Sequence, residues 1–133
     1  MANALYDPAR EAFLGGTLGW TGDIRVMLVK TGYTFSAAHQ YLSSVSGSYD
    51  NGRSASLSGY TITAGVADAN DTSLTATSAV ACDAIVIYKY NASDSAAPLI
   101  CYINSATGLP FTPAASQTVN IAFDSGANKI FKL

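Results

Sequence analysis

Residues 82–103 constrain the fold of this chain more than any other stretch. They consist of an apolar run (CDAIVIYKY), a small polar loop (NASDSAAP) and a second apolar run (LICYI). Runs rich in β-branched and aromatic residues on both sides of a short loop predict a β-hairpin. In the first run Ile85 and Ile87 share one face of the strand, and Val86 and Tyr88 share the other. Because both faces are apolar, we expect the hairpin to be covered on both sides.

Other segments of strand character follow one another along the chain. The pattern predicts strands at residues 23–30, 53–57, 60–63, 74–77, 117–123 and 128–133. Turn-forming residues separate them: a tight turn at 50–52, a bend at 58–59, a turn at 107–110 and a hairpin loop at 124–127. About eight short strands with almost no helix predict a mainly β fold, either an antiparallel β-sandwich or a jelly-roll-like barrel.

The clearest helix signal lies near the N-terminus. Asp7 is a suitable N-cap, Pro8 suits the first helical position, and Gly15 or Gly16 can end the helix. Two helical turns are too short to be stable alone, so this helix is expected to dock on a sheet or on a neighbouring molecule.

The length of 133 residues predicts one domain. We expect a single β domain over residues 1–133, with an N-terminal helical arm at 1–16 and a β body at 22–133. Within the body, a short helix capped by Ser36 is predicted at 36–42, and a polar loop at 43–48.

Composition argues for a protein that acts by contact. Charged residues make up only 12% of the chain, about half the usual fraction. Such a neutral surface suits a protein packed against neighbours, although a β protein rich in small turn residues has the same composition. The net charge of −2 with scattered basic residues argues against nucleic-acid binding. No apolar run is long enough to span a membrane, and the N-terminus lacks a signal-peptide pattern, so we expect folding in a cytoplasm.

Residues typical of catalysis or metal binding are sparse. His39 is the only histidine, and the Asp68–Asp71 segment resembles a calcium loop only in its first half. Cys82 and Cys101 would not lie opposite each other in the hairpin, so we expect reduced, buried thiols. The sequence therefore predicts no enzyme, no cofactor and no metal site. Tyr88, Tyr90 and Tyr102 leave open an aromatic sugar-binding groove as an alternative to core or interface roles.

Three stretches together resemble a known family. The opening MANALYDPAREAFLGG, the central AIVIYKY and SAAPLICYINSATGLPFTP, and the ending VNIAFDSGANKIFKL are similar to small tailed-phage virion proteins of the capsid cement, or decoration, type. The resemblance implies a β-sandwich or jelly-roll-like body on the outer capsid surface. Its partners would be the major capsid protein and further copies of itself, as a homodimer or homotrimer.

These expectations select a set of candidate interface residues. In the N-terminal arm and around the hairpin they are Leu5, Tyr6, Phe13, Tyr88, Tyr90, Tyr102, Leu109 and Phe111. The alternative function is a tail- or surface-associated carbohydrate-binding or adhesion module, which would expose a row of aromatic side chains.

Overall fold

A five-stranded antiparallel sheet, here called the main sheet, is the centre of the structure. The computed structural model describes residues 4–123, 126 and 129–133. The order of strands in the main sheet is β1 (Ala4–Leu5), β8 (Leu99–Ile103), β7 (Cys82–Lys89), β2 (Ile24–Lys30) and β3 (Asp50–Arg53). The predicted hairpin is confirmed as β7 and β8, with Cys101 opposite Ile87. Both cysteines are free and buried, as expected.

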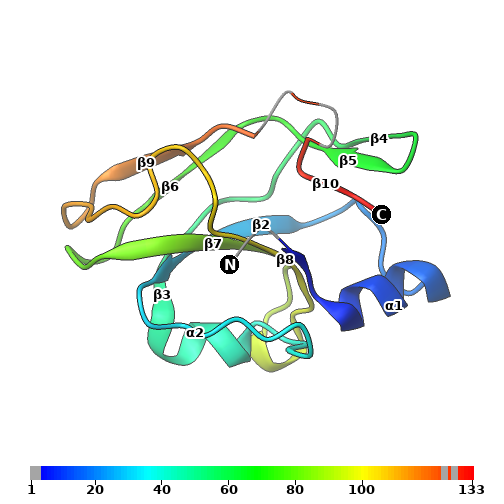
Figure 1. Cartoon of the computed structure of the whole chain (residues 1–133), viewed down its shortest axis with the longest axis horizontal. Helices are drawn as coiled ribbons and strands as arrows, with labels where there is room; N and C mark the ends of the chain where they lie inside the picture. Colours follow the sequence, from blue (N-terminus) through cyan, green and yellow to red (C-terminus); the bar gives the residue numbers. More distant parts are fainter. Residues whose placement is uncertain (1–3, 124–125, 127–128) are drawn as a thin grey trace.

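A second layer of strands covers one face of the main sheet (Figure 1). It contains a three-stranded sheet of β10 (Phe131–Lys132), β5 (Val66–Asp68) and β4 (Thr61–Thr63), and a pair formed by β6 (Thr72–Thr75) and β9 (Thr118–Ile121). The other face of the main sheet carries α1 (Asp7–Gly15), α2 (Ser43–Tyr49) and the short 3-10 helix η1 (Asp94–Ala96). The fold is therefore mainly β, antiparallel and sandwich-like, as predicted, and the described residues form two α-helices and one 3-10 helix.

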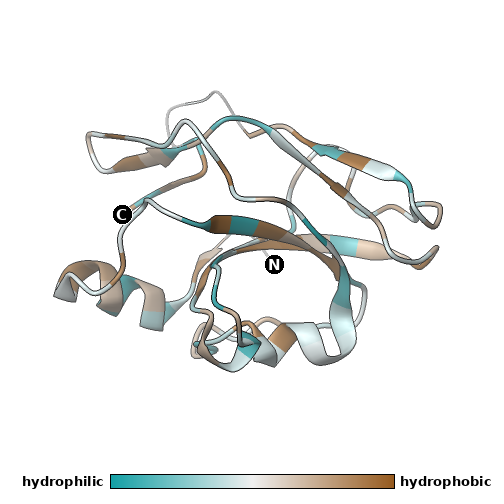
Figure 2. Cartoon of the chain, turned by 180° about the vertical axis from the view of Figure 1, so that it is seen from behind, coloured by the Kyte–Doolittle hydropathy of each residue, from teal (hydrophilic) through white to brown (hydrophobic). Residues whose placement is uncertain are grey.

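The core lies on both sides of the central strands. Val26, Met27, Leu28 and Val29 in β2 are all fully buried, and the middle of β7 is buried in the same way. In Figure 2 the strongest hydrophobic colouring follows the strands that lie between the helices and the second layer. Continuous apolar runs are the pattern expected of strands covered on both faces. The chain itself supplies much of the cover predicted for the hairpin.

Helix α1 forms where it was predicted, but it begins differently. Tyr6 is the N-cap and makes no side-chain capping bond, and Asp7 is the first helical residue. The backbone N–H of Asp7 instead donates to the carbonyl of Ala37, 2.8 Å away, so a tertiary contact replaces the cap. Gly16 ends the helix in the left-handed conformation, with φ 79°, which glycine adopts at little cost.

The region between β2 and β4 corrects two predictions. No helix forms at residues 36–42, where Ala37 and Ala38 make a turn; α2 forms instead in the expected polar loop. The reason is tertiary, because Leu42 and Val45 are fully buried against the core and this outweighs the poor helix propensity of serine and glycine.

The predicted tight turn at residues 50–52 is also wrong, since these residues form β3. The side chain of Asn51 is fully buried. It accepts hydrogen bonds from Thr77 Oγ1 and from the backbone N–H of Ser78, both at 3.0 Å, and donates to the carbonyl of Ser78 at 3.1 Å. Asn51, a residue type that is common in turns, therefore joins β3 to the segment after β6.

The C-terminal strands also differ from the prediction. The expected hairpin loop at 124–127 falls mostly outside the described residues. Strand β10 does not lie beside β9; it pairs with β5, while β9 pairs with β6. Strands β5 and β6 follow each other along the chain, so their partners, β10 and β9, lie one after the other along one edge of the second layer.

Candidate protein-interaction groove

Four of the eight candidate interface residues lie in the core of the single chain. Leu5, Tyr6, Tyr88 and Tyr102 are each at most 5% exposed. Their side chains are already covered by other parts of the chain, which leaves little of their area for a partner. The sequence pattern shows that a side chain is apolar, but it cannot show whether the same chain or a partner buries it.

Tyr6 and Tyr102 belong to an aromatic cluster beneath the main sheet. The hydroxyls of Tyr6 and Tyr33 share a hydrogen bond of 3.0 Å, and the Tyr33 hydroxyl lies 2.8 Å from Nδ1 of His39. The Tyr102 ring stacks on Phe35 at 5.0 Å between centroids. His39 therefore has a structural partner in this cluster.

Stability is expected to fall at alkaline pH because of these buried phenols. Burial raises the pKa of Tyr6, Tyr33, Tyr88 and Tyr102 above the usual value. The unfolded chain loses these protons near the ordinary pKa of about 10, whereas the folded chain retains them, so the free energy of unfolding declines as pH rises above about 10. Urea unfolding at a series of pH values measures this decline. Tyr102→Phe removes one such group and should make the decline shallower; a stability that does not change between about pH 9 and 11 would contradict the expectation.

Tyr90 and Phe13 remain closer to the surface than the four buried residues. Tyr90 is 41% exposed, but the guanidinium of Arg25 lies 4.0 Å above its ring. Phe13 is half-buried against Phe131, with ring centroids 5.8 Å apart. The three hairpin tyrosines, of which only Tyr90 is exposed, do not form the exposed row that sugar binding would need.

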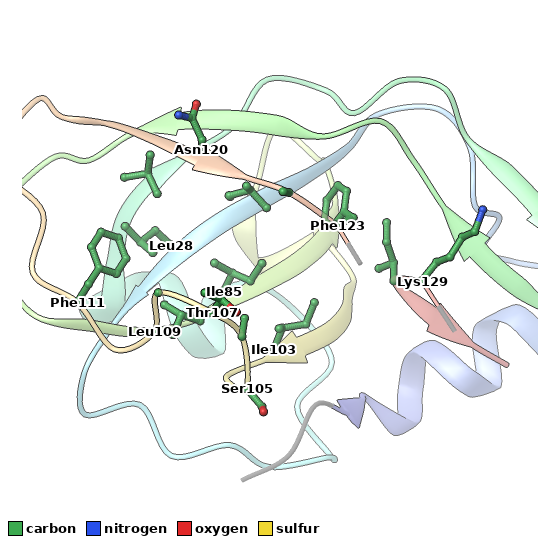
Figure 3. Close-up of a pocket in the computed structure, with 16 residues that line it drawn as sticks. Leu28, Ile85, Ile103, Ser105, Thr107, Leu109, Phe111, Asn120, Phe123 and Lys129 are labelled. Carbon is green, nitrogen blue, oxygen red and sulfur yellow. The ribbon is translucent and has the colours of Figure 1, made fainter. Parts of the chain in front are cut away.

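Leu109 and Phe111 are brought together in the wall of a cavity of about 800 Å³ (Figure 3). The cavity lies between the main sheet and β9. Its floor is formed by Leu28, Ile85 and Ile103 from the three central strands. Its roof is formed by Val119, Ile121, Phe123 and Ile130.

The alternation of residues 117–123 explains this roof. Val119, Ile121 and Phe123 share one face of the segment, and that face is turned to the cavity. The side chains are only half-buried, unlike the fully buried floor residue Leu28. The alternation predicted which side chains would face inward. It gave no sign that the space below them would stay open, so these residues were missing from the predicted interface.

A second cavity of about 350 Å³ continues the first along the edge of the sandwich. Both are lined by Ile103, Lys129 and Ile130. The second cavity adds residues from β1, β8, β10 and α1, including Arg10 and Lys132. We refer to the two cavities together as the edge groove.

The charge of the edge groove differs from that of the whole chain. Arg10, Lys129 and Lys132 line it, which is three of the seven lysines and arginines, and none of its described lining residues is acidic. Lys129 lies 3.4 Å from Asp68 and Arg10 3.9 Å from Asp7. Each of these acidic side chains offsets one cation of the groove, so this end keeps a net positive charge through Lys132.

Exposed apolar side chains gather at one end of the molecule. Leu14 in α1 is 83% exposed, Ile62 in β4 is 67% exposed, and Leu133 follows β10. Figure 1 shows α1, β4 and β10 at the same end. This end and the edge groove share β10, whereas the exposed Val80 and Tyr90 belong to neither.

Metal-ligating side chains are not grouped together among the described residues. No three His, Cys, Asp or Glu side chains among them are grouped to hold a metal ion. Asp71, from the half calcium loop, accepts the backbone N–H of Phe123 at 2.9 Å, which is a structural contact. In the same part of the chain, no helix combines the length and apolarity required to cross a membrane.

The edge groove is therefore the surface feature with the most distinct chemistry. It combines half-buried apolar walls, a basic end and two edge strands. Four residues of the predicted interface line it: Leu109 and Phe111 in the first cavity, and the largely buried Leu5 and Tyr102 in the second. Comparison of the chain with protein-family models, curated proteins and solved structures found no match.

Proposed function

We propose that the protein is a structural virion protein of the capsid cement type, which binds the outer surface of a tailed-phage shell as an oligomer and stabilises it. The observation that carries this proposal is the edge groove, whose apolar side chains are only half-buried by their own chain. The low fraction of charged residues in the chain and the exposed apolar end support the same function. The sequence resemblance supplies the identity of the shell.

The mechanism is thermodynamic. A protein that binds only the assembled, expanded shell stabilises that state by mass action, by about 2.7 kcal/mol per site when its free concentration is 100 times Kd. Contacts repeated by an oligomer over a symmetric shell multiply the effect through a high effective concentration. A homodimer or homotrimer placed on a symmetry axis would provide this repetition.

Binding to shells tests the proposal directly. Purified protein is mixed with expanded shells that lack it, from the tailed phage that encodes the chain, and sedimented. We expect saturable co-sedimentation at a fixed number of copies per shell and a higher disruption temperature of the shell. Unexpanded shells are the matched control and should bind less.

The same preparation reports the oligomeric state. Light scattering coupled to gel filtration should give a mass above that of one chain at micromolar concentration. A monomer that stays in the supernatant with both kinds of shell would contradict the proposal.

A further inference from the structure

We propose that the edge groove binds an extended polypeptide segment in which apolar side chains alternate with carboxylates. In the virion this segment would belong to the shell protein, an assignment that rests on the proposed function. The proposal is argued from the walls of the groove, its charge and the strands at its rim.

The walls determine the apolar part of the ligand. Half-buried Ile103, Phe111, Val119 and Ile121 come from both layers and face a common space. Figure 3 shows Leu109, Phe111 and Ile103 in a row beneath β9. Apolar area that a partner removes from water contributes roughly 25 cal/mol per Å², so a ligand with apolar side chains on one face is favoured.

The charge at one end determines the polar part. Arg10, Lys129 and Lys132 line the part of the groove beside β10. Asp7 and Asp68 pair with the first two of these cations, so one net positive charge remains at this end. Carboxylates complement this end. A nucleic acid would complement the same cations, but the apolar walls next to them offer no further phosphate contacts.

The strands at the rim favour a polypeptide over a fatty acid. In the part of the chain that the structure describes, β9 and β10 each have a neighbouring strand on one side only. The open sides of edge strands carry backbone N–H and C=O groups that can pair with an added strand. A fatty acid could use the apolar walls and the cations, but not these backbone groups.

Two synthetic peptides test the inference on the full chain. One is an eight-residue peptide that alternates leucine with glutamate, and the other is its matched leucine–lysine counterpart. In amide NMR spectra, the glutamate peptide should shift the signals of Ile103, Val119, Ile121 and Phe131 in a saturable way, and the lysine peptide should not.

Charge reversal identifies the basic end. The variant Arg10→Glu/Lys132→Glu should weaken binding of the glutamate peptide by about tenfold. Lys30→Glu, which changes a lysine outside the groove, is the matched control and should leave affinity within about twofold. If the double variant does not fold, titration of the original chain in 1 M salt, where charges are screened beyond roughly 3 Å, gives the same comparison.

Several outcomes would overturn the inference. The inference is wrong if neither peptide shifts the signals of the groove residues, or if both peptides shift them equally. It is also wrong if the double variant binds the glutamate peptide as tightly as the original chain does, or if the fatty acid laurate shifts these signals and the glutamate peptide does not. The last result would identify a lipid-type ligand.

Measuring the binding of shells to the double variant and to the original chain distinguishes a failure of this inference from a failure of the proposed function. If shells bind the double variant as well as the original chain, the groove does not contact the shell protein, and the cement function remains. If the peptide binds in the groove but no shell binds the protein, the proposed function is wrong, and the ligand chemistry of the groove remains.

Discussion

Replacing Trp20 with alanine is expected to lower the free energy of unfolding by about 4 kcal/mol. Trp20 is buried, and its indole packs edge-on against Tyr60 at 5.7 Å and Phe131 at 5.2 Å. Its Nε1–H donates to the carbonyl of Asp68 at 2.7 Å. These partners belong to the three-stranded sheet or precede it directly, so Trp20 fixes that sheet over the main sheet.

Trp20→Phe is the matched control for this prediction. Phenylalanine keeps much of the ring contact and removes the hydrogen bond to Asp68, so we expect a smaller loss of about 2 kcal/mol. Urea unfolding followed by circular dichroism measures both variants. A loss below about 1 kcal/mol for Trp20→Ala would show that this sheet is held to the core by other contacts.

Gly52→Ala is expected to destabilise the protein by about 3 kcal/mol, from backbone strain and a steric clash. Gly52 has φ 124°, a conformation that L side chains rarely adopt. A Cβ at this position would lie 2.3 Å from the carbonyl oxygen of Thr75, which is backbone and cannot rotate away. The substitution would force β3 away from β6 and disturb the hydrogen bonds of the neighbouring Asn51 to Thr77 and Ser78.

Gly47→Ala provides the contrast. Gly47 lies within α2, and a Cβ there would meet nothing within 4 Å. Since alanine is the better helix former, we expect Gly47→Ala to stabilise the protein by up to about 1 kcal/mol. Thermal unfolding of the two variants side by side checks the pair. Equal effects at both positions would mean that β3 can move away from β6 without cost.

The strands with long apolar runs could be predicted because their signal is local. The run at residues 82–90, the run at 99–103 and the strand at 23–30 all form as expected, and the loop length placed Cys101 opposite Ile87. The short helix after Tyr6 formed for the same reason, since proline and glycine act on their own backbone.

The errors have a common cause in distant contacts. A polar segment became α2 because Val45 reaches the core, and Asp50–Arg53 became a strand because its side chains bond to residues around 77 and 94. Such contacts join residues far apart in the sequence, and no local pattern encodes them. Distant contacts also explain why Tyr88 is buried by its own chain whereas Phe111 lines the edge groove.

By itself the sequence determined that this chain is mainly β, that its central hairpin is covered on both faces and that its two cysteines are buried and unpaired. These properties follow from residue type and spacing along one segment. Only the tertiary structure decided that the chain covers much of this hairpin itself and that an open space with a basic end remains between its layers. Whether such a space stays open depends on how side chains from both layers fill the volume between them, and this volume exists only once the layers have packed together.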